Sequence, residues 1–158
     1  MIDHSLTPQL KKHQQPCVSA RSGMVITGST PAALAGLEVL QAGGNAIDAA
    51  IATAAALTVS EPTGNGLGSG MHMIAWVDGT LIGLNASGTS PASCTLENVL
   101  NKYTDISSMP KYDWTPVLVP GAVKGWEMMH QRFGKLPFKQ CLDPAIGLAE
   151  DGFVVGPM

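Results

Sequence analysis

The most constraining feature of the sequence is residues 46–59, an alanine-rich segment in which Asp48 is the only charged residue. Its apolar side chains surround the whole circumference of a helix, and such a helix must be buried on nearly every side. Gly43–Gly44 end the segment before it, Asn45 stands at the N-cap position, and Glu61–Pro62 stop the helix. Because alanine allows close packing, we predict a fold built around this helix.

Few charged residues are available to cover the surface of such a fold. Only 13% of the 158 residues are charged, whereas a soluble domain typically has about 25%. This deficit indicates that protein outside these residues buries part of the surface. The length suits one domain or a piece of one. A net charge of −3 argues against a nucleic-acid partner, and 45% hydrophobic residues argue against disorder.

The amino-terminal residues differ from the rest of the chain. Residues 1–22 are polar and aperiodic, and we expect a flexible arm that becomes ordered only against a partner. Residues 23–158 then form an incomplete domain. The first 23 residues lack the apolar run of a secretory signal, so we expect a cytoplasmic protein. No segment is apolar for 18 residues or more, so no membrane association is expected.

Local patterns predict the remaining elements. Thr30 is the expected N-cap of a helix and Pro31 its first residue. The buried side of this helix contains either Leu34, Leu37 and Leu40 or Ala35 and Val39. Asp78–Gly79 is typical of a tight hairpin turn. The expected elements are a strand at 24–27, a helix at 31–42, the helix at 46–59, hairpin strands at 71–77 and 80–84, a short helix at 95–103, a helix from 121 to 133, and a segment at 138–151 that Pro144 divides into a turn and a helix.

A loop with glycine at every second position follows the alanine-rich helix, at residues 63–70. Three interpretations are open: an anion-binding nest, a loop whose glycines allow tight packing, or a wall of an acyl-substrate pocket. Phosphate-binding loops run from a strand into a helix, whereas this one runs from a helix into a strand. The same reversed order makes Ser69 a poor candidate for a nucleophile.

The residues with reactive side chains form no familiar motif. Cys17, Cys94 and Cys141 are odd in number and scattered, which argues against a disulfide framework. The four histidines show no metal-ligand spacing. Asp48 and Glu61 lie at the two ends of one helix, which fits capping better than acid–base catalysis. We therefore predict neither a metal site nor a cofactor, and no catalytic residue within these residues.

Six short segments occur in a distinctive order and spacing. They are GMV at 23–25, GGNAIDAA at 43–50, Glu61–Pro62 with the glycine loop, VPGAV at 119–123, RFGKLPF at 132–138 and AEDGF at 149–153. Together they resemble the amino-terminal part of the γ-glutamyltransferase (γ-glutamyltranspeptidase) family, over about residues 23–155. The pattern GGNA-[IV]-DAA is highly specific.

The resemblance implies the N-terminal-nucleophile hydrolase fold, an α+β αββα sandwich of which this chain supplies the amino-terminal portion. In such enzymes a precursor cuts itself into a large and a small subunit. The threonine exposed on the small subunit attacks a γ-glutamyl amide, as in glutathione, with its own amine as base. The implied partners are that small subunit, the rest of the large subunit and a small γ-glutamyl or related acyl molecule, with a homodimer of heterodimers as one arrangement.

One departure from the family concerns substrate recognition. Members of the family have an arginine that binds the substrate's α-carboxylate through two hydrogen bonds. This arginine comes shortly before an Ala-Pro or Ser-Pro dipeptide. The segment LNASGTSP at 84–91 has Ser87 and Thr89 at the two positions where that arginine is expected. Asn85, Ser87 and Thr89 are therefore the candidate substrate-binding residues. The sequence LNASG at 84–88 most resembles that of the intracellular branch of this family, which is related to cephalosporin acylases.

Two hypotheses from different classes remain. The first is an enzyme fragment that belongs to an acyltransferase or hydrolase of γ-glutamyl or related acyl amides. The second is a family-like protein without catalysis that acts as a binding or structural module, which the missing arginine favours. A downstream threonine preceded by a cleavage site would support the first.

Overall fold

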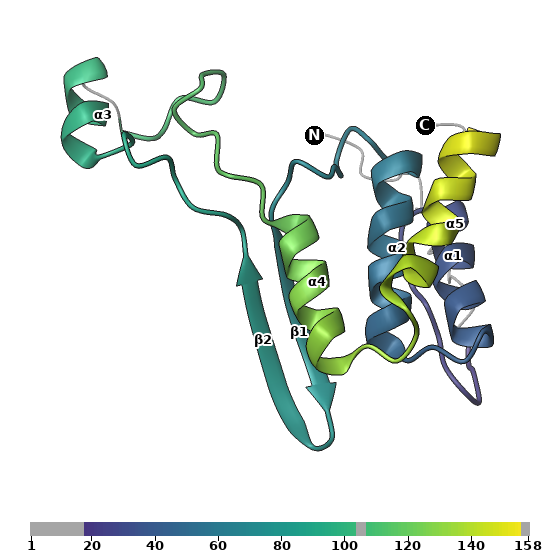
Figure 1. Ribbon diagram of the computed structural model, residues 1–158. Coiled ribbons are helices and arrows are strands. Elements are labelled where there is room, and N and C mark those ends of the chain that lie inside the picture. Colours follow the sequence, from purple (N-terminus) through teal and green to yellow (C-terminus); the bar gives the residue numbers. More distant parts are fainter. Residues whose placement is uncertain (1–17, 104–106, 156–158) are drawn as a thin grey trace, which may run out of the picture.

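A computed structural model describes residues 18–103 and 107–155. Residues 1–17 of the expected amino-terminal arm lie outside these ranges, and residues 18–22 are exposed and belong to no helix or strand. The elements, in chain order, are α1 (Thr30–Gln41), α2 (Ala46–Ser60), β1 (Met71–Val77), β2 (Thr80–Ala86), α3 (Leu96–Lys102), α4 (Ala122–Phe133) and α5 (Phe138–Asp151). Figure 1 shows α1, α2 and α5 side by side, with α4 between them and the hairpin.

The alanine-rich helix α2 is the centre of the core, as the sequence predicts. Asn45 caps it through a capping box in which the side chains of Asn45 and Asp48 each bind the other residue's backbone N–H. Glu61 ends the helix. The buried side chains of α2 are Ile47, Asp48, Ala49, Ile51, Ala52, Thr53, Ala55 and Ala56. Ala46 and Ala50 are exposed, so one stripe of the helix is uncovered among the described residues.

Helix α1 packs on α2 through its small side chains. Its buried residues are Ala32, Ala35, Gly36 and Val39, whereas Leu34 is 60% exposed. Of the two faces that the sequence left open, the alanine face is therefore the buried one. A side chain on Gly36 would overlap the hydroxyl of Thr53, which explains the close approach. The N-cap is Ser29, not Thr30, and its hydroxyl donates to Ser60 Oγ (2.7 Å) instead of capping the helix.

The hairpin β1–β2 is antiparallel, with Val77 opposite Thr80. Asp78 (φ 48°) and Gly79 (φ 79°) both have positive φ, as in a type I′ turn. One face, with Met71, Met73, Ala75, Ile82 and Leu84, packs against the helical core. The other face exposes Ile74, Trp76 and Leu81. Apolar side chains on both faces are typical of a sheet that lies between two layers.

Helix α5 differs from its prediction. It is one continuous helix with Pro144 in its interior, although an internal proline removes a backbone hydrogen bond at a cost of about 3 kcal/mol. Cys141 and Ala145, on either side of the proline, are buried against the core. Burial on both sides of Pro144 offsets that cost and keeps the two halves in one helix.

The strand predicted at 24–27 is also wrong. No described segment pairs with these residues, and a strand requires a hydrogen-bonded neighbour. Their exposure nevertheless alternates as in a strand: Val25 and Thr27 are half-buried, whereas Met24 and Ile26 are exposed. The local pattern is therefore that of a strand, without the partner that would complete it.

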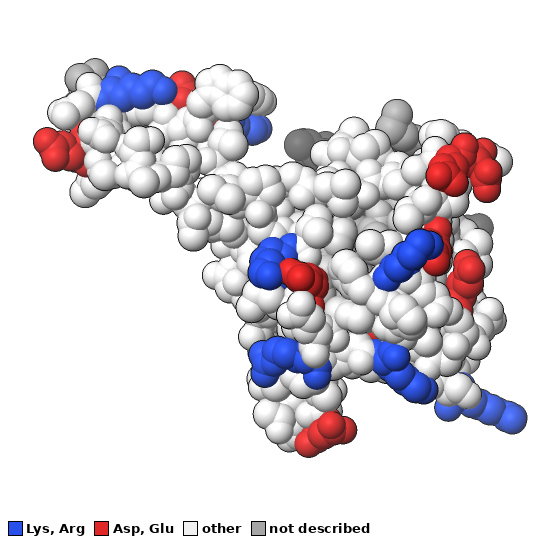
Figure 2. Space-filling view, in the orientation of Figure 1, with Lys and Arg blue, Asp and Glu red and all other residues white. Residues whose placement is uncertain are grey.

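Residues 89–103 and 107–119, here called the α3 lobe, extend away from the helical body (Figure 1). Thr95 caps α3 by accepting a hydrogen bond from the backbone N–H of Asn98 (3.2 Å). The lobe exposes large apolar side chains, among them Leu96, Tyr112 and Trp114. Figure 2 shows that charged side chains are scattered over this view, with wide uncharged surface between them. Among helices in the described ranges, none has the length and hydropathy to cross a bilayer.

Candidate functional site

Three segments meet at the junction that contains the predicted substrate residues. They are the end of the glycine loop at Ser69, the end of β2 at Ala86 and the start of α4. The carbonyl of Ser69 accepts hydrogen bonds from the backbone N–H groups of Gly121 (3.1 Å) and Ala122 (2.9 Å). The glycine loop thus satisfies the first donors of α4 and fixes where that helix begins.

Glycines allow these segments to approach closely. A Cβ on Gly70 would lie 2.6 Å from Ser87 Cα and 2.6 Å from Ser87 O. Gly88 has φ +90°, and a side chain there would overlap the carbonyl of Val119. A Cβ on Gly68, in contrast, would have no atom within 4 Å. The tight-packing interpretation therefore holds for the end of the glycine loop and not for all its glycines.

The predicted substrate residues lie at the end of β2 and in the segment that follows it. Asn85 Oδ1 accepts from both the backbone N–H (3.0 Å) and the hydroxyl (2.8 Å) of Ser87, which closes an Asx turn. Because that oxygen is used, the Asn85 amide group presents its N–H donors away from the turn. Thr89 is exposed, and its carbonyl accepts from Val119 N (2.9 Å). A role in substrate binding stays a prediction for all three residues.

The junction contains no lysine, arginine, aspartate or glutamate, over residues 63–72, 84–91 and 117–121. The groups available there are an amide, hydroxyls, backbone N–H groups and the imidazole of His72, which is exposed and lies opposite Asn85 in the hairpin. Such donors can hydrogen-bond an uncharged or anionic acyl group, but they include no guanidinium or ammonium group for a carboxylate.

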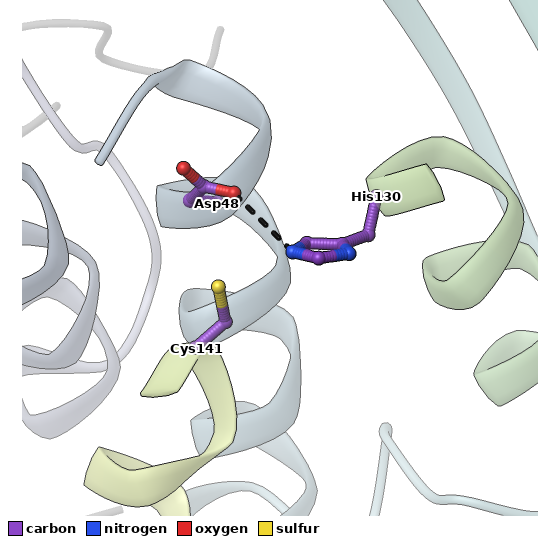
Figure 3. A group of neighbouring side chains, drawn as sticks. All are labelled: Asp48, His130 and Cys141. Carbon is purple, nitrogen blue, oxygen red and sulfur yellow. Dashed lines mark ion pairs between the residues drawn. The ribbon is translucent and has the colours of Figure 1, made fainter. Parts of the chain in front are cut away.

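A second cluster, formed by Asp48, His130 and Cys141, lies in the core between α2, α4 and α5 (Figure 3). Its centre is the fully buried carboxylate of Asp48. The backbone N–H groups of Asn45, Lys135 and Leu136 donate to this carboxylate at 3.0–3.2 Å. His130 Nε2 lies 3.8 Å from Asp48 Oδ1 and 2.7 Å from the carbonyl oxygen of Leu136.

One ligand atom from each of these three residues lies within 4.8 Å of the others, a spacing that suits a metal ion. Their hydrogen bonds do not fit this role. A carbonyl only accepts, so His130 Nε2 carries a proton toward Leu136 and offers no lone pair. Burial, together with the nearby Asp48 carboxylate, raises the pKa of Cys141 to about 11, which keeps the thiol protonated. The cluster therefore holds the start of α2 against the 134–136 turn.

Sequence spacing could not reveal this cluster, because Asp48 in α2 is far along the chain from His130 and Cys141, which lie in the consecutive helices α4 and α5. The only local signal was Asp48 in the capping box, a position that indicates a structural role. The capping hydrogen bond confirms this structural role. Asp48 has a second structural role, because it also accepts hydrogen bonds from the distant residues Lys135 and Leu136. His130, which is half-buried, is likewise satisfied by its hydrogen bond with the carbonyl of Leu136.

The comparisons with known proteins agree on one family. The family model described as Gamma-glutamyltranspeptidase matches residues 32–158. The chain is 43% identical over 152 residues to the acylase ACY 1 proenzyme of Pseudomonas sp. (strain V22), covering 91% of this chain and 27% of the relative. It is 38% identical over 143 residues to the glutathione hydrolase proenzyme of Pseudomonas sp. (strain A14), covering 89% of this chain and 25% of the relative.

A solved structure shows the same likeness in three dimensions. The cephalosporin acylase from Bacillus halodurans superimposes with a TM-score of 0.78 at 46% sequence identity, over 91% of this chain and 28% of that one. The chain thus spans about a quarter of the length of the curated relatives it matches.

Proposed function

The chain belongs to the γ-glutamyltranspeptidase family, and from that premise we propose that it forms the amino-terminal part of an enzyme that cleaves γ-glutamyl or related acyl amides. The α+β fold of the N-terminal-nucleophile hydrolases, expected from the sequence, is confirmed by the superposition on the acylase. In the αββα sandwich, the hairpin supplies part of one sheet. Its exposed face with Ile74, Trp76 and Leu81 is where the second sheet packs.

The nucleophile in this proposal is a threonine outside these residues, exposed when the proenzyme cuts itself. Its hydroxyl oxygen bonds to the acyl carbon as the amide C–N bond breaks, and its own amine passes the hydroxyl proton to the departing amine. Water or a second amine then takes the acyl group. The chain described here supplies the scaffold and one wall of the acyl site.

The observation that carries the proposal is the junction at Asn85–Thr89, which contains no lysine or arginine. It lies at the end of β2, where the family's substrate segment is expected, and glycine contacts hold it in place. Its donors are the Asn85 amide and the exposed Thr89 hydroxyl. Because the junction contains no lysine or arginine, we propose that acyl groups without an α-carboxylate bind better than γ-glutamyl groups.

The test uses the full-length protein that contains this chain. We expect self-cleavage into two chains and release of p-nitroaniline from butyryl-p-nitroanilide, which lacks the carboxylate, with a lower KM than for γ-glutamyl-p-nitroanilide. A variant in which the newly exposed threonine is replaced by alanine should release none. A full-length protein that stays uncleaved and inactive toward both substrates would overturn the proposal and favour the non-catalytic module.

A further inference from the structure

The α3 lobe contains a cavity of about 460 Å³, within the usual range of small-molecule sites. It lies between α3 and the segment that leads to α4. Its lining residues are Pro91, Ser93, Cys94, Asn98, Val99, Lys102, Trp114, Thr115, Val117, Leu118 and Val119. No sequence motif points to a role for this part of the chain.

The cavity adjoins the candidate acyl site. Val119 lines the cavity, and its backbone N–H donates to the carbonyl of Thr89 (2.9 Å). Pro91, two residues after Thr89, lines it as well. A ligand held along Asn85–Thr89 therefore has this cavity beyond Thr89.

The one cation in the lining is already paired. Lys102 Nζ donates to Asp113 Oδ1 (2.8 Å) and to Thr115 Oγ1 (3.1 Å), and it lies 4.9 Å from the centre of the Tyr103 ring. The hydrogen bond to Lys102 holds the pKa of Asp113 well below its usual range, so both partners stay charged at neutral pH. A ligand carboxylate would have to compete with Asp113 for this lysine.

The other polar groups of the lining are also largely engaged. The Asn98 amide nitrogen donates to the carbonyl of Ser93 (2.8 Å), and the Thr115 hydroxyl donates to Asp113 (2.7 Å). What remains for a ligand is the apolar surface of Val99, Val117 and their neighbours. Such a surface favours an uncharged, apolar group.

We propose that this cavity binds the distal end of the acyl group and selects acyl groups that end in an uncharged aryl or alkyl body. The inference rests on the proposed function and names its substrate class. Lys102 lines the cavity and is held by Asp113, so it does not bind the ligand's charge.

The experiment compares two anilides with the same leaving group in the full-length, self-cleaved enzyme: 4-phenylbutyryl-p-nitroanilide and acetyl-p-nitroanilide. Burial of the phenyl ring should lower KM by about ten- to a hundredfold relative to the acetyl compound. Val117→Phe places a ring in the cavity and should abolish most of this advantage, because it should raise KM for the phenylbutyryl compound much more than KM for the acetyl compound. Leu100→Phe is the matched control, because Leu100 lies on α3 and does not line the cavity. It should preserve the advantage.

Equal KM values for the two anilides in the wild type would overturn the inference. Because both anilides would still be cleaved, the proposed function would remain intact in that case. The inference is also wrong if Val117→Phe raises both KM values equally. If that variant does not mature, inhibition of the wild type decides: 4-phenylbutyramide should inhibit more strongly than glutaramate, and the reverse order refutes the inference. If the wild type releases no p-nitroaniline, the proposed function fails, and calorimetric titration with 4-phenylbutyramide still tests the cavity.

Discussion

The carboxylate of Asp48 and the backbone N–H of Lys135 are joined by two hydrogen bonds of 3.1 Å, although Asp48 lies in α2 and Lys135 follows α4. The same carboxylate accepts the backbone N–H of Leu136 (3.2 Å) and, through the capping box, that of Asn45 (3.0 Å). One buried charge therefore fixes both the start of the central helix and the turn between α4 and α5.

This relationship predicts that Asp48→Asn destabilises the protein strongly. The amide keeps one acceptor oxygen but directs an N–H₂ group at backbone donors, and bonds to a charged acceptor contribute about 1.5–3 kcal/mol each. We expect a loss of about 2–4 kcal/mol in the free energy of unfolding, measured by denaturant titration of the full-length protein. Glu38→Gln, which removes a carboxylate from the exposed surface of α1, is the control and should stay within about 0.5 kcal/mol of wild type. Equal midpoints for the two variants would contradict the argument.

Asn45→Ala should also lower stability, because Asn45 contributes more than an N-cap. Its Oδ1 accepts from the backbone N–H groups of Ile47 and Asp48, and its Nδ2 donates to the carbonyl of Phe133 (2.6 Å). Loss of an N-cap costs about 0.5–2 kcal/mol, and we expect the upper end of that range. Asn45→Ser restores a cap and should recover part of the loss. Wild-type stability of Asn45→Ala with loss of turnover would instead place Asn45 in the active site.

Elements whose limits depend on neighbouring residues could be predicted from the sequence. The limits of α2 follow from Asn45 and Glu61, and the hairpin turn follows from Asp78–Gly79. Predicted and observed bounds of these elements differ by two residues or fewer. In each case the determining contacts lie within a few positions along the chain, so the local pattern contains the information.

Features that depend on distant contacts could not be predicted. The 24–27 segment has the pattern of a strand, but strand formation depends on a partner that no local pattern reveals. Helix α5 continues through Pro144 because Cys141 and Ala145 pack on α2. At the candidate site, the sequence pointed to Asn85, Ser87 and Thr89 but not to the Asx turn that ties the first two together. That turn determines which donors face outward.

The glycine loop offers a matched pair of variants. Gly70→Ala should destabilise the junction, because its Cβ would lie 2.6 Å from backbone atoms of Ser87, a distance that requires the backbone to shift. Gly68→Ala adds the same methyl group to the same loop, at a position where its Cβ would have no other atom within 4 Å. We expect a stability loss of about 1–3 kcal/mol and a raised KM for Gly70→Ala, and neither effect for Gly68→Ala. Identical behaviour of the two variants would show that the junction tolerates the shift.

Cys141 predicts a dependence of stability on alkaline pH. Burial raises its pKa from 9.0 to about 11, so the unfolded chain loses this proton at a lower pH than the folded protein does. The stability contributed by the buried thiol is thus complete below pH 9 and disappears between about pH 9 and 11. Denaturation midpoints of wild type and Cys141→Ala should converge over this interval. A constant difference from pH 8 to 11 would show that the thiol titrates normally in the fold.

The final prediction concerns the missing arginine, and the structure distinguishes the two positions where it could be restored. Ser87 is half-buried, its hydroxyl is bound to Asn85, and its backbone lies against Gly70. An arginine there would break the Asx turn. Thr89 is exposed and can accept a long side chain without moving its neighbours. Thr89→Arg, and not Ser87→Arg, should therefore restore a cation to the junction.

A guanidinium–carboxylate bond contributes about 1.5–3 kcal/mol, and each 1.4 kcal/mol is about tenfold in affinity. Thr89→Arg should therefore lower KM for γ-glutamyl-p-nitroanilide by about one to two orders of magnitude in the full-length enzyme. Thr89→Gln adds length without charge and should bring little improvement. Added salt should reduce the gain from arginine, because the new interaction is exposed. If the wild type already binds the γ-glutamyl substrate at micromolar concentration and neither Thr89→Arg nor Ser87→Arg improves it, another group holds the carboxylate, and the substrate site does not lie at Asn85–Thr89.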